Sequence, residues 1–279
     1  MFFRARQFEF RFPRPTLIMG IVNVTPDSFS DGGKFFDTDA AVAHALELVA
    51  QGAEILDIGG ESTRPGAEPV DEAEELRRVI PVIEKLVGQT KAALSIDTLK
   101  PAVARAALVA GASIVNDVGA HRSDPAMWQA VAAYRAGYIC MHAQGTPATM
   151  QKNAAYTDVV REVGEFFQER FGKMNEQGIA TDQIVFDPGI GFGKTLEHNL
   201  SLLAGLKQFQ KLNRPLLLGV SRKSFIEKFS GARLNERLPA SLACATLAID
   251  DGVQIIRTHD VGETVSAVRI AEAVLSRKK

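Results

Sequence analysis

The chain has 279 residues, 46% of them hydrophobic and 23% charged, with a formal net charge of −1. This fits one large α/β domain spanning residues 1–279, and the short basic run at 277–279 argues against nucleic-acid binding, which needs clustered Lys and Arg. No stretch reaches the ~18 uninterrupted apolar residues of a membrane span, and the N-terminus lacks the continuous apolar core of a secretory signal. We therefore expect a cytoplasmic protein in which Cys140 and Cys244 are free and buried.

Residues 2–13 alternate aromatic and charged side chains. Phe8, Phe10 and Phe12 fall on one side of an extended chain, which is the period of a β-strand. We expect residues 1–15 to form a β-hairpin ahead of the first strand of the main sheet. Its phenylalanines would shield the end of the core at which that strand begins.

Eight short apolar runs follow, and each ends abruptly at polar or charged residues before a helix-like stretch. The runs are LIMGIVN (17–23), EILDIG (54–59), ALSID (93–97), SIVND (113–117), GYICMH (137–142), QIVFD (183–187), LLLGV (216–220) and VQIIR (253–257). This alternation predicts a (β/α)8 TIM barrel with right-handed crossovers, whose floor the hairpin covers. The rival is an open, doubly wound sheet. It would concentrate its polar strand ends at one switch point, whereas here they follow all the runs.

Helix signals lie between the runs. The clearest helical stretches are 38–51, 71–87, 156–177 and 262–276. Asp71 and Glu74 have the spacing of a capping box, and Pro101 suits the first turn of a further helix, where its missing N–H costs nothing. Gly52 and Gly178 follow the ends of two helices, as C-terminal stop signals do.

Polar residues at the ends of the eight runs are the candidate site. In a parallel barrel the carboxyl ends of all strands meet at one mouth, so these residues would share it. They are Asn23, Asp57, Asp97, Asn116, His142, Asp187, Ser221, Arg222, Lys223, Arg257 and His259. Buried carboxylates need proton donors, and the loops after the last two strands of such barrels often bind phosphate. The residue types therefore predict a ligand with a nitrogen-rich ring and a phosphate-bearing arm.

Three loops carry further signals. They are residues 23–33, 59–66 and 187–195. Paired glycines end the first loop, which suits a closing lid. Thr63 and Arg64 in the second could clamp an anion or a carboxylate. The third is not a phosphate loop, since Pro188 stands where that motif needs glycine. We interpret it as a flexible segment that presents Asp187 and Phe192 to a ligand.

Several of these residues also have structural interpretations. Asp57 could simply cap the loop that follows it, and His142 is more typical of a core histidine than of a catalyst. Arg222 could point outward into an ion pair, and Trp128 is expected to pack within a helix. No His/Cys/Asp cluster has zinc spacing.

The chain resembles the dihydropteroate synthases over essentially its whole length. The matching segments are MGIVNVTPDSFSDGG (19–33), DIGGESTRPG (57–66), SIDT (95–98), VND (115–117), MHAQGTP (141–147), DPGIGFGKT (187–195), GVSRKSF (219–225) and RTHD (257–260). One departure is Ala143, where many relatives would have methionine; we expect it to alter packing rather than chemistry.

The resemblance implies a transferase of folate biosynthesis and sulfonamide target that joins p-aminobenzoate to 6-hydroxymethyl-7,8-dihydropterin pyrophosphate in an SN1-like reaction. It implies a homodimer and Mg²⁺ held with Asn23. The implied pterin ligands are Asp97, Asn116, Asp187, Lys223 and Arg257, and the implied pyrophosphate ligands are Asn23, Arg257 and His259. The implied p-aminobenzoate slot consists of Thr63, Arg64, Pro65, Phe192 and Ser224. The implied catalytic residues are Asp97, Lys223 and Asp31, the last acting when the first loop closes.

Two other functions remain open. A methyltetrahydrofolate-binding methyltransferase module would share the acids that hold the ring, but has no reason to carry both the Thr63–Arg64 loop and the 221–223 triplet. A pterin-binding homologue without activity would differ only in turnover. The Ala-rich stretch near 240–249 could be a dimer surface or plain core packing.

Overall fold

The structure, a computed structural model, describes residues 1–25, 38–62, 67–120, 125–145, 150 and 154–278. Its strands are β1 (Phe2–Ala5), β2 (Phe8–Arg11), β3 (Leu17–Asn23), β4 (Ile55–Gly59), β5 (Ala93–Asp97), β6 (Ile114–Asp117), β7 (Gly137–Met141), β8 (Ile184–Asp187), β9 (Leu217–Gly219) and β10 (Ile255–Thr258). Its α-helices are α2 (Thr38–Ala50), α3 (Glu72–Leu86), α4 (Pro101–Ala110), α5 (Ala126–Tyr134), α6 (Val159–Glu176), α7 (Leu196–Gly205), α8 (Ser224–Ser230), α9 (Leu238–Asp250) and α10 (Val261–Leu275).

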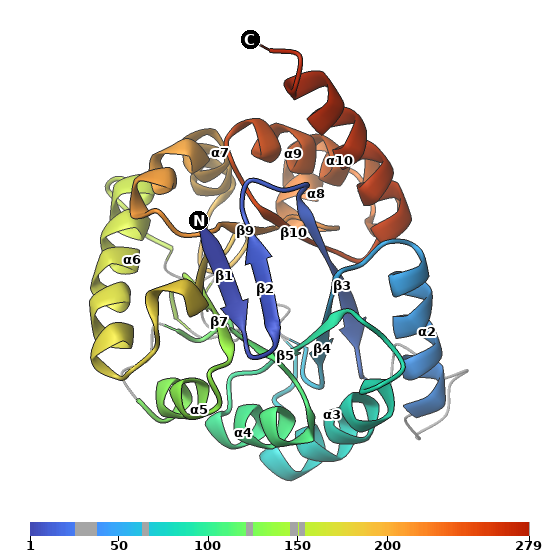
Figure 1. Ribbon diagram of the computed structural model, residues 1–279. Helices are drawn as coiled ribbons and strands as arrows, with labels where there is room; N and C mark the ends of the chain where they lie inside the picture. The colour runs from blue at the N-terminus through green and yellow to red at the C-terminus, as the bar shows by residue number, and fades with distance from the viewer. Residues whose placement is uncertain (26–37, 63–66, 121–124, 146–149, 151–153, 279) are drawn as a thin grey trace.

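Strands β3 to β10 form a nearly closed parallel barrel surrounded by the helices (Figure 1). Their order is β8-β7-β6-β5-β4-β3-β10-β9. The two edges meet at a parallel bridge between Phe186 and Leu216, where the amide of Phe186 also donates to the carbonyl of Pro215 at 3.0 Å. The predicted (β/α)8 barrel is therefore confirmed, and the open sheet is excluded.

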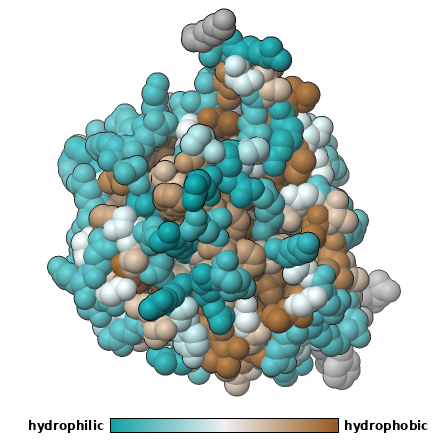
Figure 2. Space-filling view, viewed as in Figure 1, coloured by the Kyte–Doolittle hydropathy of each residue, from teal (hydrophilic) through white to brown (hydrophobic). Residues whose placement is uncertain are grey.

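The N-terminal hairpin lies across the end of the barrel at which the strands begin (Figure 1). Phe3 and Phe10 pack there against one inward side chain from every barrel strand. We call these inward side chains the floor cluster: Leu17, Ile55, Ala93, Ile114, Ile139, Val185, Leu217 and Ile255. Figure 2, viewed from the same side, shows hydrophilic residues over most of this face. The expected covering hairpin is confirmed.

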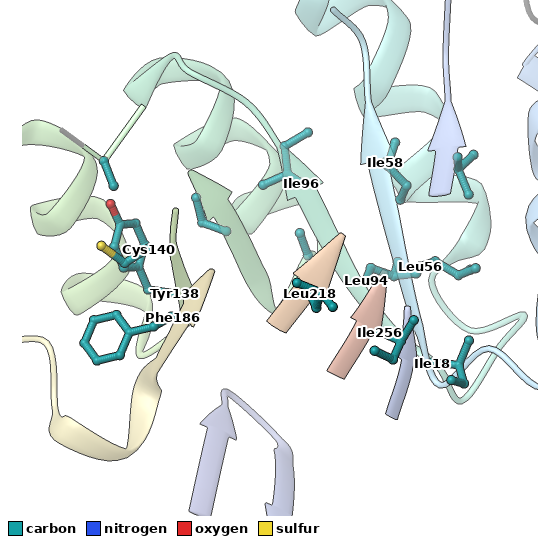
Figure 3. Close-up of a cluster of buried hydrophobic side chains, with 14 of the residues drawn as sticks. Ile18, Leu56, Ile58, Leu94, Ile96, Tyr138, Cys140, Phe186, Leu218 and Ile256 are labelled. Carbon is teal, nitrogen blue, oxygen red and sulfur yellow. The ribbon is translucent and has the colours of Figure 1, made fainter. Parts of the chain in front are cut away.

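Outward-facing strand residues make a second core beneath the helices. Ile18, Leu56 and Leu94 alternate with the inward residues of their strands, as the two-residue period requires (Figure 3). Trp128 of α5 is buried in this layer, where its indole N–H donates to the hydroxyl of Tyr138 at 3.0 Å. Its expected packing role is confirmed.

Helix starts follow the local capping chemistry. Asp71 caps α3 by accepting from the amide of Glu74 at 2.8 Å, and Pro101 opens α4 as expected. The helix predicted from residue 156 begins later, because Asp158 accepts the amide of Arg161 at 3.1 Å and thereby sets the first turn. None of the helices in the described part of the chain is long and apolar enough to cross a membrane.

Candidate active site

Polar side chains replace apolar ones on the inner face of the barrel two residues beyond the floor cluster. Successive inward residues along a strand are two apart, so the next layer lies one step nearer the mouth. On five strands this step leads from Ile55 to Asp57, Ala93 to Ser95, Ile114 to Asn116, Val185 to Asp187 and Ile255 to Arg257. The barrel is thus filled with hydrocarbon at its floor and with buried polar groups above it.

Arg257 binds two acids: Asp57 of this layer, and Asp97, which lies two residues beyond Ser95 on β5 and is counted with this layer. Its Nε donates to Asp57 Oδ2 and its Nη2 to Asp97 Oδ2, both at 2.6 Å. Asp57 also accepts from the hydroxyl of Ser95 at 2.7 Å and from the amide nitrogen of Asn116 at 2.9 Å. The five residues of this network come from four strands, β4, β5, β6 and β10, so the network fixes the positions of the inward side chains relative to one another.

The acids of this layer outnumber its nearest cation. Asp57 and Asp97 share one guanidinium, and Asp97 is buried, so its ionised form is disfavoured. Burial outweighs the positive charge of Arg257 and raises the pKa of Asp97 to about 7. Burial also raises the pKa of Asp187, against the opposing hydrogen bond from the Gly189 amide. The layer therefore favours a ligand that brings proton donors.

Two acceptor atoms in this layer have no hydrogen-bond partner within the described structure. They are Oδ1 of Asp97 and Oδ1 of Asn116, and both are buried. Buried polar atoms are nearly always hydrogen-bonded, so such a pair is the mark of a ligand site. A ring edged with N–H groups would satisfy both.

Lys223 and Phe192 meet at the mouth. The Nζ of Lys223 lies 4.1 Å from the centroid of the Phe192 ring, a cation–π contact. The positive charge of Lys223 also acts on Asp187, whose pKa it lowers against the effect of burial. Ser224 follows directly as the first residue of α8. The structure thus brings a cation, an aromatic ring and an acid together.

The loop that carries Phe192 is closely packed. A Cβ on Gly189 would lie 1.9 Å from the carbonyl oxygen of His142, and one on Gly193 would lie 2.7 Å from that of Gln144. Both glycines also have positive φ, at 65° and 63°. Their role is close approach and left-handed turns, rather than the flexibility that the sequence suggested.

The polar side chains at the ends of β9, β10 and β3 differ in their exposure and their contacts. Arg222 is 42% exposed, and its guanidinium is paired with Asp260, as its alternative interpretation predicted. His259 Nδ1 lies 3.0 Å from the Ser221 hydroxyl. Asn23 ends β3 beside Gly59 and is partly exposed at the mouth.

An apolar group lines another part of the mouth. Its buried members are Val118, Met141 and Ala143, and the partly buried Leu99 and Phe192 pack against them. Of these side chains, the sequence predicted only Phe192 as a site residue, and Ala143 was expected to affect packing alone. Apolar residues on the inner face, such as Met141 two residues after Ile139, were the signal that could have identified them.

The structure also decides two open interpretations. Asp57 is fully buried and bonded to Arg257, Ser95 and Asn116, so it belongs to the inner polar network and is not a loop cap. His142 is a buried histidine that packs edge-on against Phe166, as expected for a core residue. Four predicted site residues lie outside the described part of the chain: Asp31, Thr63, Arg64 and Pro65.

Comparison with known proteins gives consistent matches. A family model described as "Pterin binding enzyme" matches residues 19–259. The chain is 48% identical over 262 residues to the dihydropteroate synthase of Escherichia coli (strain K12), covering 94% of this chain and 93% of that protein. It is similar to the Yersinia pestis dihydropteroate synthase in complex with a sulfonamide drug, with a TM-score of 0.92, 44% identity and coverage of 99% and 100%. It is also similar to the Xanthomonas albilineans dihydropteroate synthase in complex with 7,8-dihydropteroate, with a TM-score of 0.88, 44% identity and coverage of 99% of each chain.

Proposed function

The chain belongs to the family of dihydropteroate synthases, and from that premise we propose how its site performs the reaction. It joins p-aminobenzoate to 6-hydroxymethyl-7,8-dihydropterin pyrophosphate and gives 7,8-dihydropteroate and pyrophosphate. The observation that carries the proposal is the pair of buried, unpartnered acceptors on Asp97 and Asn116 beneath a mouth that also holds Lys223. Each part of the site then has a substrate group to match.

The pterin ring enters the barrel with its amino and ring N–H groups directed inward. Asp187 and Asn116 accept hydrogen bonds from this donor edge, and Asp97, which lies near the ring, accepts a further one through its Oδ1. Lys223 donates to the carbonyl side of the ring. These contacts pair the buried acceptors with hydrogen-bond donors.

The diphosphate arm remains at the mouth with the groups that suit an anion. Arg257, His259 and Asn23 hold it, and His259 is oriented by its contact with Ser221. Arg257 is also bonded to Asp57 and Asp97, so it belongs to the pterin half and the diphosphate half of the site at once. Pterin donors that satisfy Asp97 would leave Arg257 freer to serve the diphosphate.

A magnesium ion fits this half of the site only in company with the diphosphate. Among the residues that the structure describes, no group of three or more His, Cys, Asp or Glu could hold a metal. Asn23 offers one hard oxygen at the mouth, and Mg²⁺ commonly takes one or two protein ligands together with phosphate oxygens and water. When bound there, it would offset the charge of the leaving pyrophosphate.

The p-aminobenzoate slot lies beside the pterin methylene carbon. Phe192 and Ser224 frame it from the loops after β8 and β9, together with Thr63, Arg64 and Pro65 of the second loop. The Arg64 guanidinium would pair with the substrate carboxylate. Sulfonamides, one of which is bound by the Yersinia pestis relative, would compete for this slot.

The chemistry needs positioning and charge rather than an activated nucleophile. The C–O bond to pyrophosphate breaks, and the dihydropterin ring delocalises the positive charge at its methylene carbon. The Asp97 carboxylate offsets that charge, and Asp31 acts when the first loop closes. The aniline nitrogen of p-aminobenzoate, neutral at pH 7, then attacks the methylene carbon and loses its proton to solvent. An associative route would call for a base beside this amine, where it would add little.

A coupled assay of pyrophosphate release separates this function from its rivals. With p-aminobenzoate, the pterin pyrophosphate and Mg²⁺ present, one pyrophosphate should appear for each dihydropteroate formed. A methyltetrahydrofolate-binding module or a homologue that only binds pterin would release none. Omitting Mg²⁺ tests the metal separately, because turnover should then fall while pterin binding persists.

We propose a homodimer formed through α9 and α10. Leu247, Ile270 and Val274 are exposed large hydrophobic residues on these helices, and Figure 2 shows hydrophobic side chains on that side of the molecule. An open groove between the helices is lined by Leu242, Ser266, Ala267 and Ile270, among others. Sedimentation equilibrium on a Leu247→Asp variant should give a monomer if this face is the interface.

A cytoplasmic location fits the two free cysteines.

A further inference from the structure

Lys194 is a buried lysine two residues after Phe192, which frames the proposed p-aminobenzoate slot. It is 1% exposed, and the polar-residue pattern of the strand ends did not single it out. Its Nζ lies 3.0 Å from His142 Nδ1, 3.3 Å from the His142 carbonyl oxygen and 2.9 Å from the Phe192 carbonyl oxygen. The side chain thus links the segment after β7 to the loop after β8.

Burial lowers the pKa of Lys194 to about 7. In its ammonium form it has three N–H donors, which meet the two carbonyls and, when Nδ1 carries no proton, the ring of His142. Burying such a cation is costly unless its donors are all satisfied, and here they are. Two of the acceptors are main-chain carbonyls, so Lys194 acts on the path of the backbone rather than on a single side chain. If the proton is lost, two N–H donors still serve the carbonyls, and the lone pair can accept from His142 Nδ1–H.

The two segments are in contact on both sides of this link. Gly189 and Gly193 leave no room for a Cβ against the backbone of residues 142–144. Tyr156 donates its hydroxyl to the Gly193 carbonyl at 3.1 Å, and Asn199 accepts the Gly191 amide at 2.7 Å. Between these contacts, Lys194 donates to the carbonyl oxygen of Phe192.

The ring of Phe192 is the part of this loop that reaches the proposed site. It lies under the Nζ of Lys223, at 4.1 Å from ring centroid to nitrogen. A shift of the Phe192 backbone would move the ring away from Lys223 and would change the width of the adjoining slot.

We propose that Lys194 is a positioning residue for the second substrate: by holding the Phe192 carbonyl it fixes the Phe192 ring against Lys223 and so sets the p-aminobenzoate slot. This rests on the proposed function, in which Phe192 frames that slot. The pterin ligands Asp97, Asn116 and Asp187 are held by their strands. The charge of Lys194 acts on one of them, lowering the pKa of Asp187, but more weakly than the charges of Lys223 and Arg257 do. The effect of losing Lys194 should therefore fall on one substrate.

The test compares Lys194→Met with a matched control. Arg214 is also buried, at 6% exposed, and donates to the carbonyls of Ile184 and Phe2, but it lies at the barrel floor. Arg214→Met should lower the melting temperature without changing either substrate constant. Lys194→Met should raise the KM for p-aminobenzoate roughly tenfold or more, since small misplacements are costly, while the pterin pyrophosphate Kd changes less than about threefold. Lys194→Gln, which keeps one donor group, replaces it if the Met variant does not fold.

A double-mutant cycle separates this inference from the proposed function. In a Phe192→Ala background, where KM is already raised, Lys194→Met should raise it no further, because both act through the same ring. Fully multiplicative effects, or an unchanged KM in Lys194→Met alone, overturn the role of Lys194 and leave the slot intact. An unchanged KM in Phe192→Ala alone removes Phe192 from the slot and overturns both.

Discussion

The guanidinium of Arg257 donates to the carboxylate of Asp97 at 2.6 Å. The cation proposed for the diphosphate and the acid proposed for the pterin are thus bonded to each other across the barrel mouth. Asp57 holds the same guanidinium from the other side. Binding of the pterin pyrophosphate should therefore redistribute one set of hydrogen bonds.

Asp187→Ala should weaken binding of the pterin pyrophosphate by about 2 kcal/mol or more, since it removes a charged acceptor from the donor edge of the ring. Titration calorimetry measures the loss. Asp182→Ala is the control, because that acid lies near the barrel floor, paired with Arg4, and should leave the affinity unchanged. Equal affinity for wild type and Asp187→Ala would remove Asp187 from the pterin site.

Lys223→Ala should lower kcat/KM by at least ~30-fold, because one preorganised donor is lost beside the ring and the Phe192 contact is lost with it. Steady-state kinetics measure the effect. Lys228→Ala, which changes an exposed lysine on α8, the helix that follows Lys223, should have no effect. A normal rate for Lys223→Ala would assign its side chain to the surface.

Pterin binding should release a proton near neutral pH. The pKa of Asp97 is raised to about 7 in the free site, mainly by burial, and the bound ring favours its ionised form. Affinity should therefore increase as pH rises through 7 and level off above it. Calorimetry in two buffers of different ionisation enthalpy measures the proton count, and Asp97→Asn should abolish the release. A pH-independent affinity would show that Asp97 does not change its protonation.

Asp57→Ala should destabilise the fold by about 3 kcal/mol, because the partly buried Arg257 would lose one of its two acids, and Ser95 and Asn116 would lose a buried acceptor. Urea denaturation measures this loss. Asp250→Ala, at an exposed ion pair with Lys278, should change stability by less than about 1 kcal/mol. Similar values for the two variants would mean that the network contributes little to the fold.

The barrel could be predicted from the sequence because every strand has the same local sequence pattern. An apolar run ends at a polar residue, and the carboxyl ends of parallel strands must share one mouth. Asp97, Asn116 and Arg257 were found this way, and the structure brings all three into one network. Helix boundaries were less exact, since a cap such as Asp158 depends on one hydrogen bond.

The features that could not be predicted depend on contacts between segments far apart in the sequence, and local sequence patterns do not report such contacts. Lys194 follows a glycine-rich stretch that suggested flexibility, and only the contact between two loops makes it a buried link. The apolar wall of Val118 and Met141 is not distinct in sequence from ordinary core. Asp57 was ambiguous because its role depends on Arg257, which lies 200 positions away along the chain.

The position of the pterin ring in a crystal soaked with 6-hydroxymethyl-7,8-dihydropterin pyrophosphate tests the central claim most directly. The account predicts the donor edge of the ring within ~3.2 Å of both Asp97 Oδ1 and Asn116 Oδ1, with the diphosphate beside Arg257 and His259. A ring bound elsewhere, with those two oxygens still lacking donors, would contradict it.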